Sequence, residues 1–150
     1  MSEATIQYET NVDDMDPRLW PNVLECLLDV GAHDAWVTPI IMKKGRPAFT
    51  LSVLCGDDVA ADVRAVIFRE TTTIGIRELV VRRHVLDRSE HVVDVDGQAI
   101  HVKAAMFEGD EVNRSVEWDD VVAVAAVLNM SAKAVLAAAT AAAQRHPEPG

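Results

Sequence analysis

Two hydrophobic periodicities alternate along the first half of the chain, and their order restricts the fold more than any other feature of the sequence. In residues 5–12 the apolar positions recur at every second residue, the period of a strand with one buried face. In residues 17–28 they recur three and four positions apart, as in a helix with one buried stripe. Residues 33–42 and 49–55 again have the character of strands. These segments predict a strand, a helix and then a pair of strands.

A second helix and a fourth strand complete the pattern. Asp57 or Asp58 is expected to cap this helix, which ends at Arg69. A strand rich in β-branched residues is then predicted from Ile74 to about Leu86. The order strand–helix–strand–strand–helix–strand is that of a ferredoxin-like α+β fold, in which two helices cover one face of a four-stranded antiparallel sheet.

The C-terminal part of the chain predicts an added β-hairpin and a pair of helices. Asp96-Gly97 is a strong signal for a two-residue turn between two short strands. Helical periodicity spans residues 117–128, and Ser131 can cap a last helix that ends near residue 144. We expect a flexible N-terminus at 1–4, a ferredoxin-like core plus hairpin at 5–108, a helical extension of the same domain at 109–146, and a disordered tail at 147–150.

Composition argues against several classes of partner. The chain has 14 basic and 24 acidic residues, and a net charge of −10 disfavours general attraction to nucleic acid or an anionic membrane. Cys26 and Cys55 lie far apart in apolar runs, so we expect buried thiols in a reducing compartment. The sequence shows neither a signal-peptide pattern nor an apolar run of membrane-spanning length. We therefore expect a cytoplasmic protein with no nucleic-acid partner and no membrane partner.

The predicted topology brings three connections to the same end of the sheet. These are residues 12–17, 42–47 and 69–75, and each follows an element that runs towards that end. They are also the segments richest in chemical groups. The groups are the carboxylates of Asp13, Asp14 and Glu70, the cations Lys43, Lys44, Arg46 and Arg69, the hydroxyls of Thr71, Thr72 and Thr73, and the accessible main chain of Gly45.

Carboxylates, cations and hydroxyls in one place match the requirements of a metal-bound polyphosphate. Mg²⁺ and Mn²⁺ take one or two carboxylates together with phosphate oxygens, which makes Asp13 and Asp14 the candidate metal ligands. Glu70 is the candidate catalytic residue, because it could hold the metal or a water molecule. The candidate phosphate-binding residues are Lys43, Lys44, Gly45, Arg46, Arg69, Thr71, Thr72 and Thr73.

Each of these assignments has a simpler structural alternative. The threonine-rich turn could be a polar connection without a ligand. The cations of residues 43–46 could form a solvated hairpin tip, paired with nearby acids. Asp13 and Asp14 could be acids favoured by the dipole of the following helix, and Glu70 could simply pair with Arg69. The residues alone leave these alternatives open.

Three segments also resemble one known family. They have the sequences ETNVDDMDP (residues 9–17), PIIMKKGRP (residues 39–47) and FRETTTIGIR (residues 68–77). In sequence and in order they are similar to motifs in the C-terminal, CTP-binding domain of the LarC-type nickel-insertion proteins. The resemblance extends over about residues 5–140.

The resemblance implies a reaction and its participants. In this family nickel is inserted into pyridinium-3,5-bisthiocarboxylic acid mononucleotide to form the nickel-pincer cofactor of lactate racemase. CTP is hydrolysed to CMP and diphosphate, with Mn²⁺ or Mg²⁺ as the metal of the nucleotide and Ni²⁺ as the substrate metal. The chain would be part of a CTP-dependent insertase of the lyase class. It also implies Glu117 as a further metal candidate, because an acidic run precedes the C-terminal helices of the family.

Two departures from the family keep other functions open. The chain starts directly before the first motif, so the resemblance implies a separate N-terminal domain or subunit that handles nickel, for which this sequence shows no ligand set of its own. The acidic run near Glu117 lacks the proline and tyrosine that the family often has there. The alternatives are a non-catalytic module that binds a nucleotide or metabolite, and an assembly domain that forms a homo-oligomer.

Overall fold

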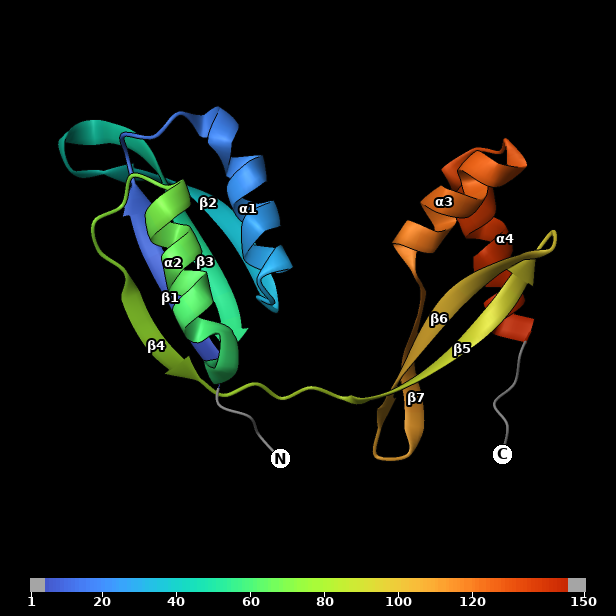
Figure 1. Ribbon diagram of the computed structural model, residues 1–150. Helices are drawn as coiled ribbons and strands as arrows, with labels where there is room; N and C mark the ends of the chain where they lie inside the picture. The colour runs from blue at the N-terminus through green and yellow to red at the C-terminus, as the bar shows by residue number, and fades with distance from the viewer. Residues whose placement is uncertain (1–4, 146–150) are drawn as a thin grey trace. The chain divides into compact units, whose positions relative to one another are not determined.

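Strand β1 (Thr5–Val12) lies at the centre of a four-stranded antiparallel sheet (Figure 1). Its neighbours are β3 (Arg46–Gly56) on one side and β4 (Arg77–Val81) on the other, while β2 (Asp34–Met42) pairs with the outer edge of β3. This computed structural model describes residues 5–145, and the chain divides into two compact units, 1–84 and 85–150. The order β2-β3-β1-β4 confirms the ferredoxin-like prediction for the first unit.

Helices α1 (Trp20–Asp29) and α2 (Ala60–Glu70) cover one face of this sheet (Figure 1). Alternate residues of β1 point towards them, and Ile6, Tyr8 and Val12 are buried in a shared apolar core. The helices contribute their predicted stripes, with Val23 and Leu27 of α1 fully buried. Burial of these faces against one another is what holds the helices on the sheet.

The helix predicted from residue 17 begins there as a single 3-10 turn, Pro17–Leu19, and continues as α1 from Trp20. Two other local details of the first unit differ from the prediction. Neither Asp57 nor Asp58 caps the second helix, because Gly56 occupies the cap position of the 3-10 turn there. The fourth strand is much shorter than the predicted 74–86. Its pairing with β1 runs only from Glu9–Arg77 to Thr5–Val81, because β1 begins at Thr5 and offers no partner to residues beyond Val81.

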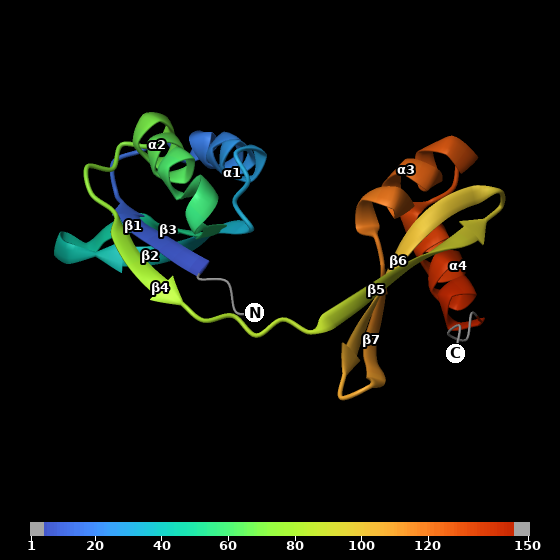
Figure 2. The same ribbon diagram turned by 60° about the horizontal axis from the view of Figure 1, so that its bottom comes forward.

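The second unit has its own sheet and its own core. Strands β5 (Asp87–Val95), β6 (Gln98–Phe107) and β7 (Asp110–Val116) form a three-stranded antiparallel sheet. Helices α3 (Trp118–Leu128) and α4 (Ala132–Arg145) pack on it, as Figure 2 shows. Val residues of β5 and β6 and alanines of α4 share one buried cluster. The fold is therefore α+β with two antiparallel sheets and four α-helices.

The second unit changes the predicted division of the chain. The hairpin was grouped with the ferredoxin-like core up to residue 108, yet it shares a core with the C-terminal helices, and the units divide between His84 and Val85. Strand β7 was not predicted, because it is an edge strand whose inward positions include Glu111 and Arg114 instead of apolar residues. Polar side chains that pair with one another remove the period-two signal.

Other C-terminal predictions are confirmed. The Asp96-Gly97 turn sets the expected register, in which Val92 lies opposite His101. The Ser131 hydroxyl accepts a hydrogen bond from the main-chain N–H of Ala134 and caps α4. The segments predicted to be flexible or disordered, 1–4 and 147–150, lie outside the described residues.

Among the described residues, no single helix is long and apolar enough to cross a membrane. Helices α3 and α4 meet that criterion only when taken together, and they are bent by 118° at the break between them.

Adjacent leucines on α1 provide a test of the first core. Leu27 is 0% exposed, whereas Leu28 is 50% exposed. We expect Leu27→Ala to lower the free energy of unfolding by about 2–5 kcal/mol, because it leaves a cavity in the core. Leu28→Ala, the matched control, should change it by about 0.5 kcal/mol or less. Urea denaturation followed by circular dichroism measures both, and equal effects would contradict the packing of α1.

Acid should weaken the second unit through Asp120. Its carboxylate accepts hydrogen bonds from the main-chain N–H of His101 at 2.8 Å and from the His101 ring at 2.7 Å. These bonds, the main-chain one first, lower the pKa of Asp120. A lowered pKa in the folded state gives stability that is complete above the unfolded-state pKa of about 3.9 and is lost as the pH falls through the folded value.

We therefore expect the protection factors of amides in β6 and the start of α3 to fall as the pH drops below about 4. Asp120→Asn should reduce this dependence on pH, because an amide does not titrate in this range. Asp119→Asn, a change at the neighbouring exposed residue, is the control. An unchanged pH profile in Asp120→Asn would show that this contact does not set acid stability.

Candidate functional site

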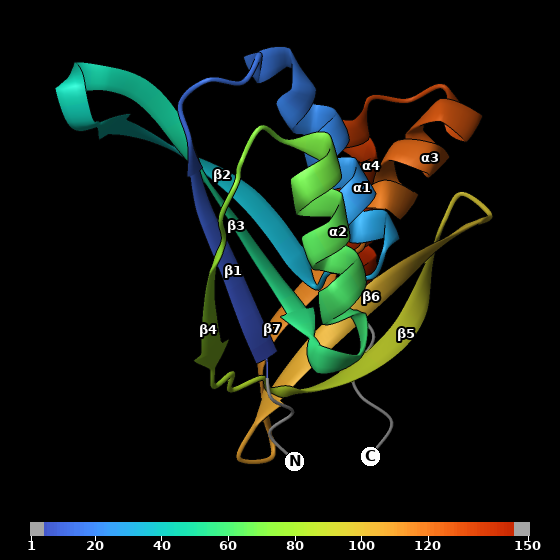
Figure 3. The same cartoon turned by 60° about the vertical axis from the view of Figure 1, so that its left-hand side comes forward.

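The three polar connections meet at one end of the first sheet, as the sequence predicted (Figure 3). Arg46 Nη1, in the β2–β3 hairpin, lies 3.4 Å from Asp13 Oδ2, in the β1–α1 connection. Thr72, in the α2–β4 turn, donates its hydroxyl proton to Asp14 Oδ1 at 2.5 Å. Side chains from segments up to 58 positions apart in the sequence are thus in direct contact.

The hairpin tip holds its cations on a constrained main chain. Lys43–Gly45 is a three-residue connection in which Lys44 and Gly45 have φ angles of 63° and 69°. Glycine adopts this left-handed region freely, whereas a lysine there is strained. All three basic residues, Lys43, Lys44 and Arg46, are exposed. The main chain also takes positive φ angles at the other two hairpin turns, Asp96-Gly97 and Glu108-Gly109, so this strain is a property of tight hairpin turns.

The β1–α1 connection leaves two of its three carboxylates for a ligand. Asp16 caps the Pro17–Leu19 turn, accepting from the Arg18 main-chain N–H at 3.0 Å and from the Arg18 guanidinium. The Arg18 side chain, followed by its main-chain N–H, lowers the pKa of Asp16. Asp13 and Asp14 each contact one neighbouring side chain through one oxygen, and the other oxygen has no bond to the described residues.

These two carboxylates fit the metal of a nucleotide better than a metal held by protein alone. The described residues contain no cluster of three or more His, Cys, Asp or Glu side chains that could hold an ion. Mg²⁺ and Mn²⁺ are hard cations that accept one or two carboxylates when phosphate oxygens and water complete the shell. Asp13 and Asp14 would supply that protein share.

The threonine turn after α2 is held by its own hydroxyls. Thr71 Oγ1 donates to the carbonyl of Ile67 at 2.6 Å and accepts from the main-chain N–H of Thr73 at 3.2 Å. Thr73 Oγ1 lies 2.9 Å from the carbonyl of Gly75. Together with the bond from Thr72 to Asp14, each of the three threonine hydroxyls of this turn has an acceptor inside the protein.

Sequence reasoning missed the residue beneath this turn. Thr10 of β1 is buried, and its Oγ1 lies 2.5 Å from Thr73 Oγ1 and 2.9 Å from the Gly75 carbonyl. The available signal was a threonine on the inward face of a strand whose other inward residues, Ile6, Tyr8 and Val12, are aromatic or aliphatic. A buried hydroxyl needs a partner, and here that partner belongs to the site.

Glu70 and Arg69 do not pair with each other among the described residues. Glu70 Oε2 accepts a hydrogen bond from Asn22 Nδ2 of α1 at 3.3 Å. Lys43, Lys44 and Arg69 form no ion pair with any residue that the structure describes. These cations are therefore available to an anionic ligand without first losing a protein partner.

Glu117 belongs to the other unit. It lies between β7 and α3, and Lys103 Nζ of β6 donates to its Oε2 at 2.5 Å. The contact with Glu117 raises the pKa of Lys103. The structure thus gives Glu117 a cation as its neighbour within the second unit.

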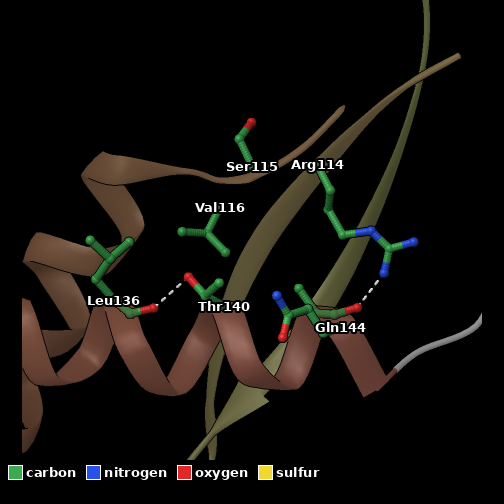
Figure 4. A pocket seen from close by; sticks show the side chains of 7 residues that line it. Arg114, Ser115, Val116, Leu136, Thr140 and Gln144 are labelled. Carbon is green, nitrogen blue, oxygen red and sulfur yellow. Dashed lines mark hydrogen bonds between the residues drawn. The ribbon is translucent and has the colours of Figure 1, made fainter. Parts of the chain in front are cut away.

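The second unit also contains a pocket of about 270 Å³ between β7 and α4 (Figure 4). Arg114 at its edge is engaged by Glu111 through two bonds and donates to the carbonyl of Ala143. Thr140 donates its hydroxyl proton to the Leu136 carbonyl at 2.7 Å. None of the predicted site residues lines this pocket, and its charge is balanced internally.

Comparison with known proteins adds independent information. A family model described as "Nickel insertion protein" matches residues 1–136. This chain belongs to the nickel insertion protein family.

Two members of the nickel insertion family show how much of such a protein the chain represents. The "Pyridinium-3,5-bisthiocarboxylic acid mononucleotide nickel insertion protein" of Nocardioides sp. (strain ATCC BAA-499 / JS614) is 54% identical over 142 residues, which are 95% of this chain and 36% of that protein. The protein of the same name from Clostridium kluyveri is 42% identical over 123 residues, 82% of this chain and 31% of that protein. The chain thus spans about a third of the length of these curated relatives.

A solved structure identifies which third is matched. It is described as LarC2, the C-terminal domain of a cyclometallase involved in the synthesis of the NPN cofactor of lactate racemase, in its apo form. The TM-score is 0.86 at 31% identity, over 97% of this chain and 100% of that one. A protein from Methanopyrus kandleri, MK0293, shares the fold at 22% identity and a TM-score of 0.65. The chain corresponds to the C-terminal portion of the family's cyclometallase.

The positive φ of Lys44 predicts that glycine at this position makes the chain more stable. Lys44→Gly should raise the free energy of unfolding by about 0.5–1 kcal/mol, because glycine removes the strain of a positive φ. Lys43→Gly, whose φ is not positive, should not raise it. Urea denaturation of the three proteins measures the difference, and a loss of stability in Lys44→Gly would show that the lysine side chain itself supports the fold.

Proposed function

We propose that this chain is the CTP-binding part of a nickel insertase that completes the nickel-pincer nucleotide cofactor. The observation that carries the proposal is the meeting of two carboxylates and several unpaired cations at one end of the first sheet, within the three segments that resemble the family. The net charge of −10 makes this local group of cations exceptional, since the protein as a whole repels anions.

The proposed chemistry is mainly positioning and charge neutralisation. Lys43, Lys44, Arg46 and Arg69 would bind the triphosphate oxygens, since lysine and arginine form strong charge-assisted bonds to phosphate. Mn²⁺ or Mg²⁺, held by Asp13 and Asp14, would supply additional neutralisation of charge on the phosphate oxygens.

Hydrolysis of CTP to CMP and diphosphate also needs a positioned nucleophile. Glu70 Oε2 is oriented by Asn22, and its other oxygen could accept a proton or a hydrogen bond from the attacking water. Glu70 is the proposed catalytic residue for this reason. Glu117 is proposed as a further metal ligand on the family resemblance alone.

The whole insertion reaction requires more than this chain. The two curated relatives described above are about three times as long, and both are named as pyridinium-3,5-bisthiocarboxylic acid mononucleotide nickel insertion proteins. We propose that an N-terminal domain or subunit brings Ni²⁺ and this substrate, while the chain described here brings CTP. This proposal has two alternatives. The chain could instead be a non-catalytic nucleotide-binding module or an oligomeric assembly domain.

Calorimetry decides among these functions. The chain should bind CTP with Mn²⁺ more tightly than ATP, GTP or UTP with the same metal, and CMP should appear when the N-terminal part of a relative and the pyridinium substrate are supplied. Binding without turnover in that mixture would favour the regulatory module. If no nucleotide binds, the proposed function is wrong and the assembly domain is the favoured alternative.

Single substitutions at the hairpin tip should separate binding from folding. We expect Lys44→Ala and Arg46→Ala each to weaken the affinity for CTP with Mn²⁺ by about ten- to a hundredfold, the effect of losing one charge-assisted contact. Their melting temperatures should change little, because both side chains are exposed. Lys133→Ala, an exposed lysine of α4 in the second unit, is the control. Unchanged affinity in both variants would place the triphosphate elsewhere.

A further inference from the structure

A triangle of oxygen atoms connects the central strand to the threonine turn. Thr10 Oγ1 and Thr73 Oγ1 are 2.5 Å apart, and each lies 2.9 Å from the carbonyl oxygen of Gly75. Thr10 is only 2% exposed, so this triangle is closed to bulk water from the side of the sheet. It is the contact by which β1 holds residues 73–75.

The two hydroxyl protons of this triangle are both used inside it. A separation of 2.5 Å between two hydroxyl oxygens requires a proton between them. Each hydroxyl has one proton to donate, so the second proton goes to the Gly75 carbonyl. Whichever threonine donates to the other, Thr73 keeps no proton for a phosphate.

The hydroxyl protons of the other two threonines are also donated within the protein. Thr71 donates to the Ile67 carbonyl and Thr72 donates to Asp14. In the described chain, the donors of this turn without an acceptor are the main-chain N–H groups of Thr72, Ile74 and Gly75. Main-chain N–H groups presented by a turn are efficient anion donors. The threonine side chains therefore set the conformation of the turn, and its main-chain N–H groups remain available to bind an anion.

We infer that Thr10 is a positioning residue of the proposed triphosphate site. Its buried hydroxyl holds the main chain of residues 73–75 in one conformation, so that the N–H groups of the turn are preorganised before the anion arrives. This inference rests on the proposed function, because the anion is the triphosphate of CTP. Thr10 itself is covered by the turn and does not contact the ligand.

Three threonine variants of the full chain test the inference. Thr10→Val keeps the shape and removes the hydroxyl, Thr10→Ser keeps the hydroxyl, and Thr5→Val is the matched control on the same strand, where Thr5 is 3% exposed. In the ligand-free chain we expect ¹⁵N order parameters of residues 73–75 to fall in Thr10→Val from the rigid value of about 0.85 towards 0.6. They should stay unchanged in Thr10→Ser and Thr5→Val.

Affinity gives the second readout. CTP with Mn²⁺ should bind Thr10→Val about tenfold more weakly than wild type, as expected for a lost hydrogen bond, and should bind Thr10→Ser and Thr5→Val within about twofold of wild type. Unchanged order parameters, or an unchanged affinity despite a mobile turn, would overturn the inference. If the wild-type chain binds no triphosphate, the proposed function fails, while the relaxation data still decide whether Thr10 fixes the turn.

Discussion

The pairing of β1 on both of its edges is the constraint on which the first unit depends. Because β3 and β4 occupy the two edges, the inward face of β1 must meet both helices, and its apolar residues become the centre of the core. The same pairing places the end of β1 beside the β2–β3 hairpin and the α2–β4 turn. The candidate site is therefore a consequence of the sheet, since no single segment contains enough groups to hold a polyphosphate.

Charge and strain are unevenly distributed in this unit. The core is made of neutral residues, whereas the end of the sheet combines exposed lysines and arginines with the carboxylates of Asp13 and Asp14. Lys44 occupies a backbone conformation that glycine would adopt at lower cost, and it does so beside a glycine. The same pair of positive φ angles occurs at the Glu108-Gly109 turn, so it reflects the geometry of a tight hairpin. The proposed triphosphate would be bound by the cations that this turn exposes.

Each unit has its own cluster of buried apolar residues. The second sheet buries its valines against small residues of α4, in a cluster separate from the core of the first sheet. An ion pair between Lys103 and Glu117 and the hydrogen bonds between His101 and Asp120 attach β6 to the beginning of α3. The family relationship covers both units, which indicates that the C-terminal portion of the cyclometallase is built from this pair.

The sequence by itself determined the order of elements in the first unit, the hairpin at Asp96-Gly97 and the end of the sheet where polar segments meet. These features depend on periodicity, turn chemistry and chain direction, all of which are local. Tertiary structure alone decided the length of β4, the existence of the polar edge strand β7 and the grouping of the hairpin with the C-terminal helices. It also decided that the hydroxyls of Thr71, Thr72 and Thr73 bond within the protein and that Thr10 supports their turn. Hydrogen-bond partners distant in sequence set these outcomes, because a proton donated to a neighbour across the fold is no longer available to a ligand.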